Sequence, residues 1–131
     1  MKPNVLLTIA SLLSLLFLTF HLAGDIVYGF EPGGLSNLVG AVLISVVWLY
    51  GILMLSERRS GYIIMLLLSL FSLVVPYVHM QGKGVGTASR LVGTSGHFFF
   101  VWTLLAIGML GLLSAILAAH GLWNFSWRRS R

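Results

Sequence analysis

The residues that could do chemistry in this sequence are histidines and acidic residues. Four of them, His21, Asp25, His79 and His97, stand at the ends of long apolar runs. His21 and Asp25 are four residues apart, so a helix would place them on one face, one turn apart. His79 closes a second apolar run, and His97 opens another. Ionisable residues within membrane spans are costly unless they are paired, and they therefore indicate a functional site.

Three imidazoles and one carboxylate form a chemically sensible ligand set for a divalent transition metal. Neutral imidazole suits Zn, Fe, Cu or Ni, and a carboxylate can complete the shell or orient an imidazole from behind. We therefore predict His21, Asp25, His79 and His97 as metal ligands. A metal with an open position could hold a water activated for hydrolysis.

Two other interpretations of the histidines remain open. Two of the three (His21, His79 and His97) could instead ligate a b-type haem between helices, as cofactors in helical bundles often sit. Imidazole also titrates near neutral pH, which would suit a proton-sensing role. The fourth histidine, His120, stands at the opposite end of its run, and we interpret it as an interfacial anchor.

The composition requires lipid as the solvent for most of the chain. Of 131 residues, 58% are hydrophobic and 8% are charged, and the mean hydropathy is +0.99. A soluble domain carries roughly 25% charged residues, so this chain could not cover a water-facing surface. We predict one transmembrane domain over residues 1–131. The absence of cysteine excludes disulfides, thiolate metal sites and cysteine nucleophiles.

The elements that must position these residues are four apolar runs, each near the ~20 residues that a helix needs to cross a bilayer. The fold class is therefore an all-α integral membrane protein, a bundle of four transmembrane helices near 5–24, 36–55, 62–80 and 96–120. The short connection at 56–61 predicts an antiparallel hairpin, and the glycine-rich stretch 81–95 has room for a small structured cap. A cleaved signal peptide is the alternative for the first run, but its apolar core is too long and lacks a small-x-small cleavage site.

Basic residues predict the orientation of the bundle. Six of them fall on one side and two on the other, namely Lys2, Arg58, Arg59, Arg128, Arg129 and Arg131 against Lys83 and Arg90. The positive-inside rule then places both termini in the cytoplasm and the His21–Asp25 end outside, in what we expect to be a bacterial inner membrane. Because these charges flank spans and do not pave a face, they favour lipid contact and argue against nucleic-acid binding.

Small and polar residues follow helical spacing within three of the runs, and we expect these faces to point into the bundle. The faces are Asn4, Thr8, Ser11, Ser14, His21 and Asp25 in the first run; Ser69, Ser72, Pro76 and His79 in the third; and, in the fourth, His97 followed through Val101 by Gly108, Gly111, Ala115 and Ala118. The second run offers Gly40, Ala41 and Ser45 for packing and has no titratable group.

Two functions from different classes follow. The first is an outward-facing histidine and carboxylate site that binds a divalent metal (Zn, Fe or Cu) or haem. The alternative is a non-catalytic accessory subunit, packed by its small-residue faces against a larger membrane complex or against copies of itself. The sequence contains neither H-E-x-x-H nor G-x-S-x-G, so no motif selects a reaction.

Overall fold

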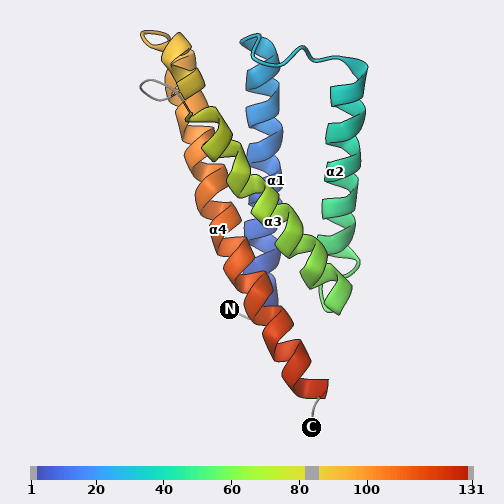
Figure 1. Ribbon diagram of the computed structural model, residues 1–131. Helices are drawn as coiled ribbons and strands as arrows, with labels where there is room; N and C mark the ends of the chain where they lie inside the picture. Colours follow the sequence, from blue (N-terminus) through green and yellow to red (C-terminus); the bar gives the residue numbers. More distant parts are fainter. Residues whose placement is uncertain (1–2, 82–85, 130–131) are drawn as a thin grey trace.

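The computed structural model describes residues 3–81 and 86–129, with only the backbone described at residues 3 and 126–129. Its elements, in chain order, are α1 (Pro3–Val27), α2 (Leu35–Leu53), α3 (Arg59–His79), the short 3-10 helix η1 (Gly86–Leu91) and α4 (Ser95–Arg129) (Figure 1). All four α helices are long and apolar enough to cross a membrane. The predicted four-helix membrane fold is confirmed. Lys2, Lys83 and Arg131, which contributed to the predicted orientation, lie outside the described residues.

Successive helices run in opposite directions, so that both ends of the chain lie at the same end of the bundle (Figure 1). We call this end the terminal end; it also carries the short connection between α2 and α3. The opposite end, which we call the histidine end, carries the 28–34 loop and η1 (Figure 1). Which end faces the cytoplasm stays a prediction from the basic residues.

The close packing in the bundle involves α4, which lies against both α3 and α1. The small residues of α4 make this possible. A Cβ added to Gly111 would lie 2.2 Å from Ser72 Oγ and 3.3 Å from the Ser69 carbonyl oxygen of α3. Ala115 and Ala118 are also buried. The predicted small-residue face of α4 is therefore occupied within the chain itself.

The polar faces predicted for α1 and α3 point into the bundle. Ser11 and Ser14 of α1 and Ser69 and Ser72 of α3 are completely buried. The Ser14 hydroxyl donates to the Ala10 carbonyl, and the Ser72 hydroxyl donates to the Ser69 carbonyl. These faces lead toward the histidine end, where His21, Asp25 and His79 stand.

Helix α2 packs closely at only one end. Its buried residues are Trp48, Gly51 and Ile52, all near the terminal end, where a Cβ on Gly51 would lie 2.6 Å from Ile64 of α3. Nearer the histidine end, a Cβ added to Gly40 would meet nothing within 4 Å. Gly40, predicted as a packing residue, therefore faces open space, and the first half of α2 stands away from α1 and α3.

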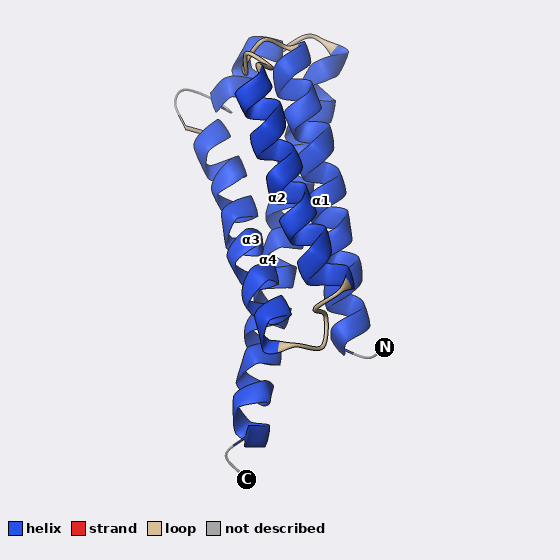
Figure 2. Cartoon of the chain, turned by 90° about the vertical axis from the view of Figure 1, so that its right-hand side faces the viewer, coloured by secondary structure: helices blue, strands red, loops and turns tan. Residues whose placement is uncertain are grey.

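Helix α4 is longer than the predicted run 96–120. It has 35 residues, which corresponds to roughly 52 Å of helix, whereas the hydrocarbon core is only about 30 Å thick. Figure 2 shows its last turns projecting beyond the terminal end. The helix continues beyond the apolar run because residues 122–129 contain no proline or glycine that would stop the helical conformation.

Candidate functional site

Helix α1 supplies two of the three ionisable side chains that meet at the histidine end. His21 and Asp25 lie one turn apart on its inner face, with relative exposures of 2% and 4%. The Asp25 carbonyl also accepts the N–H groups of Phe30 and Glu31, which folds the chain back at the end of α1. The same residue thus terminates the helix and places its carboxylate inside the bundle.

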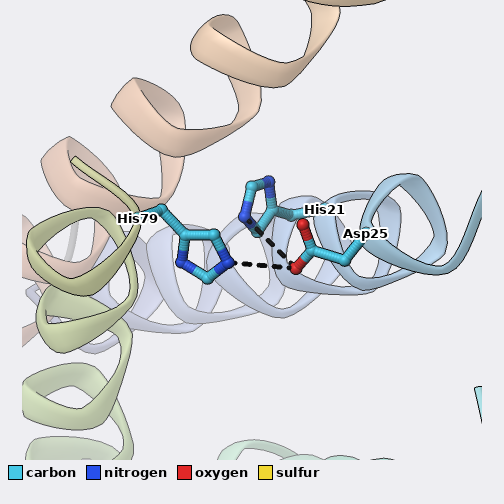
Figure 3. Close-up of side chains that lie close together, drawn as sticks. All are labelled: His21, Asp25 and His79. Carbon is cyan, nitrogen blue, oxygen red and sulfur yellow. Dashed lines mark ion pairs between the residues drawn. The ribbon is translucent and has the colours of Figure 1, made fainter. Parts of the chain in front are cut away.

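Helix α3 brings the third side chain to the same carboxylate oxygen. The Nε2 atom of His79 lies 3.2 Å from Asp25 Oδ2, and the Nε2 atom of His21 lies 3.6 Å from that same oxygen (Figure 3). One ligand atom from each of His21, Asp25 and His79 lies within 4.8 Å of the others. We call these three side chains the His–Asp–His group.

The opposite nitrogen of each imidazole is held by the protein. His79 Nδ1 lies 2.9 Å from the Val75 carbonyl oxygen, which can only accept, so this nitrogen carries a proton. The Thr103 hydroxyl of α4 donates to the Phe100 carbonyl and must therefore accept from His21 Nδ1, at 3.1 Å. In the neutral form of each ring the proton therefore resides on Nδ1, and the Nε2 atom that faces Asp25 offers its lone pair to a metal ion. When a ring is protonated, its Nε2–H instead points at Asp25 Oδ2 as an ion pair.

Two buried atoms in this group have no hydrogen-bond partner. Among the described residues, nothing donates a hydrogen bond to His21 Nε2 or to Asp25 Oδ1. Buried polar atoms are almost always bonded, and those that are not point to a missing ion, water or functional role. With the His21 ring neutral, both of these atoms present a lone pair, which suits a cation or a hydrogen-bond donor.

Aromatic rings cover the group. The Phe100 ring centroid lies 4.7 Å from that of His21 and 5.9 Å from that of His79. Phe30 packs edge-on against Phe100 at 5.3 Å, and the Arg90 guanidinium lies 5.8 Å from the Phe30 ring centre. Residues from the 28–34 loop, η1 and α4 thus cover one side of the group.

On another side the group borders a cleft of about 720 Å³ between α1, α2 and α3. His21, Asp25 and His79 line it together with Glu31 and Asn37, whose side chains are joined by a hydrogen bond of 3.0 Å. The remainder of the lining is predominantly apolar and includes Leu18, Leu22, Ile26, Gly40, Ala41, Val42, Val46, Phe71 and Val75.

The structure brings together three of the four residues predicted as ligands. His97 lies outside the His–Asp–His group, in the first turn of α4, and its Nε2 atom is buried without a partner among the described residues. His120 is exposed at the far end of the same helix, next to the Asn124 amide. The predicted roles of these two histidines stay predictions.

Thr103 is a contributor that the sequence reasoning missed. It is completely buried and fixes the His21 ring through its hydroxyl. The only signal in the sequence was a lone hydroxyl residue in the apolar run Phe98–Ile107. Such residues are ordinary in membrane helices, so this one did not stand out.

Comparison with protein-family models, with curated proteins and with solved structures found no match for this chain, so its function has to be inferred from the geometry of the site.

Proposed function

We propose that His21, Asp25 and His79 bind one divalent transition metal ion at the histidine end of the bundle. The observation that carries this proposal is the direction of the two imidazoles. Both Nδ1–H groups donate to the protein, and both Nε2 atoms face one carboxylate oxygen, so that in the neutral rings Nε2 is the nitrogen free to bind a metal. Second partners on the far nitrogen are what orient metal-binding histidines in general.

The spacing of the ligand atoms supports a single ion. Bonds of about 2.0–2.2 Å in a tetrahedral shell place neighbouring ligand atoms roughly 3.3–3.6 Å apart. The two histidine-to-aspartate distances are 3.2 and 3.6 Å. A small approach of the two imidazoles would complete the arrangement, since all three ligand atoms already lie within 4.8 Å.

The geometry favours a metal ion over haem. The His21 and His79 ring centroids are 4.8 Å apart, and the rings stand edge to face. Bis-histidine haem needs the two imidazoles on opposite faces of a porphyrin, with an Fe–N bond on each side. Both rings would have to move well apart to admit it, and Asp25, which contacts both, would then stand at the haem plane.

Two imidazoles and a carboxylate are the donors of open metal sites. Catalytic Zn²⁺ sites use three protein ligands and leave a fourth position for water or substrate. Two histidines and one carboxylate also hold Fe²⁺ in non-haem oxygenases. Such an ion, when bound, supplies a Lewis acid next to a cleft between membrane helices. The chain's own residues orient the imidazoles, exclude water and leave one side open.

Metal analysis of the purified protein tests the proposal. The protein would be purified in detergent without chelator, analysed for bound elements and titrated with Zn²⁺ and Fe²⁺ against a chromophoric chelator. We expect one ion per chain, with strongly weakened binding in His21→Ala, Asp25→Asn and His79→Gln. His97→Ala is the matched control, since His97 lies outside the group.

Three results would contradict the proposal. They are the absence of any stoichiometric ion, wild-type affinity in His21→Ala, Asp25→Asn and His79→Gln, and a haem absorption band in the purified protein. A loss of binding in His97→Ala equal to that in His21→Ala would instead enlarge the ligand set to the one predicted from the sequence. Size-exclusion chromatography and helical circular dichroism would verify that each variant is folded.

A further inference from the structure

The cleft between α1, α2 and α3 has a polar end and an apolar body. Its ionisable and amide side chains gather at the histidine end, in His21, Asp25, Glu31, Asn37 and His79. The hydroxyls of Thr19 and Ser45, which also line the cleft, donate to backbone carbonyls of their own helices. Toward the middle of the bundle the lining becomes apolar, with Leu18, Val42, Val46, Phe71 and Val75. This is the polarity of an amphiphile with its head at the histidine end, because each part of such a molecule would meet matching surface.

The cleft is also open to the side. The first half of α2 has no buried residue, and α2 makes no close approach to α4 within the described part of the chain. In a helix that crosses a membrane, this leaves the gap between α2 and the α1–α3 pair facing lipid. A molecule dissolved in the bilayer could therefore enter between the helices without passing through water.

The size of the cleft suits a small molecule. Its volume of about 720 Å³ falls within the roughly 300–1,000 Å³ of ligand sites. Its wall on α2 extends from Ser36 to Val46, a helical length of roughly 15 Å. That length holds the head and the first part of an alkyl chain, and the side opening lets the remainder lie in the bilayer.

The polar end selects the chemistry of the head. The unpartnered atoms are Asp25 Oδ1 and His21 Nε2; the first accepts hydrogen bonds, and the second accepts in the neutral ring. A head with one O–H group can donate to one of the two. Asp25 and Glu31 line this end, and no lysine or arginine lines the cleft in the part of the chain that the structure describes. An anionic head would therefore meet two carboxylates and neither a lysine nor an arginine of the described residues. A quaternary ammonium head offers no donor hydrogen.

We infer that the cleft binds a neutral, hydroxyl-bearing amphiphile with an alkyl chain, drawn from the bilayer, with its hydroxyl at the His–Asp–His group. The inference rests on the proposed function in one respect: if the His–Asp–His group held a metal ion, the hydroxyl oxygen would bind that ion, whereas in the metal-free protein the hydroxyl would donate to an acceptor of the group. It adds the class of molecule that reaches the site and the route by which it arrives.

A photo-crosslinking experiment on the full chain tests this. The protein is reconstituted in vesicles of neutral phospholipid, depleted of metal, and exposed to hexadecanol carrying a diazirine in its chain. Palmitic acid and hexadecyl-trimethylammonium with the same diazirine serve as head-group comparisons. We expect the alcohol to label residues of α2 between 36 and 46 and the facing part of α1, and unlabelled hexadecanol to compete.

A pair of neighbouring variants separates the cleft from the lipid surface. Gly40→Phe places a ring into open space in the cleft, since a Cβ there meets nothing within 4 Å. Val39→Phe adds the same ring at the next residue, which is exposed and outside the cleft lining. Labelling by the alcohol should be lost in Gly40→Phe and retained in Val39→Phe.

Equal labelling in the two variants, or stronger labelling by the acid or the ammonium probe than by the alcohol, would overturn the inference. Metal affinity, measured in parallel, should be unchanged in both variants because neither changes a ligand. Labelling that depends on Gly40 in a protein that binds no metal would support the cleft and remove the metal site. If the protein binds metal but Gly40→Phe leaves the labelling unchanged, the metal site would stand and the cleft inference would fall.

Discussion

Replacing Thr103 with valine tests the reasoning about the imidazoles most directly. Valine keeps the shape of threonine and removes the hydroxyl that accepts from His21 Nδ1 at 3.1 Å. With no acceptor on that side, the neutral ring gains by moving its proton to Nε2, where Asp25 Oδ2 is 3.6 Å away. The Nε2 lone pair is then no longer free for a metal.

The structure also sets the magnitude of this effect. To bind metal in the variant, His21 must return its proton to Nδ1, where it remains buried and unpaired because His21 is only 2% exposed. A buried unsatisfied donor costs about 1–3 kcal/mol, which converts to a loss of affinity of roughly 5- to 150-fold. Measured effects of removing an outer partner from a metal-bound histidine, typically 10- to 100-fold, fall within this range.

Competition between the protein and a chromophoric chelator for Zn²⁺ would measure this loss. Thr103→Ser restores the hydroxyl and should recover most of the affinity. Thr8→Val is the matched control, since Thr8 also donates to its own helix, at the Asn4 carbonyl, but lies near the terminal end of α1. Equal affinity in Thr103→Val and the wild type, or equal losses in Thr103→Val and Thr8→Val, would refute the tautomer assignment.

Two further predictions concern helix packing and proton competition. Gly111→Ala should lower the free energy of unfolding in detergent by about 1–3 kcal/mol, as overpacking does. The reason is that the new Cβ would lie 2.2 Å from Ser72 Oγ and displace it. Gly108→Ala should be neutral or stabilising, since its Cβ would lie 3.4 Å from Pro76 and alanine favours helix; a reversed order would contradict the packing. Acidification should release the bound metal, because protons and the ion compete for the same Nε2 lone pairs; equilibrium dialysis at several pH values would measure it, and tighter binding in acid would contradict the ligand assignment.

Much of the site could be predicted from the sequence because its key relation is local. The spacing of His21 and Asp25 fixes their shared face on any helix. His79 followed from the topology, since the third run ends at the same side of the bundle as the first. The burial of the polar faces on α1 and α3 followed from helical periodicity in the same way.

The contribution of α4 could not be predicted, because it depends on the axial offset between α4 and the helices packed against it. At the depth of His21, α4 presents Thr103, whereas His97 lies six residues, or roughly 9 Å of helix, closer to its start. Hydropathy locates a span to within several residues and does not fix this offset. The open face at Gly40 was missed for a related reason, since a small residue marks close packing and empty space equally well.

The uneven attachment of α2 has a mechanical consequence. Near Trp48 and Gly51 the helix is clamped to its neighbour, whereas its other end is tethered by the 28–34 loop and the exposed bond from Asn37 to Glu31. A helix that is packed closely only at one end tilts about that end, and its other end then moves furthest. We therefore expect substitutions at Trp48 or Gly51, about two helical turns or more from Gly40, to change the tilt of α2 and with it the width of the cleft beside His79.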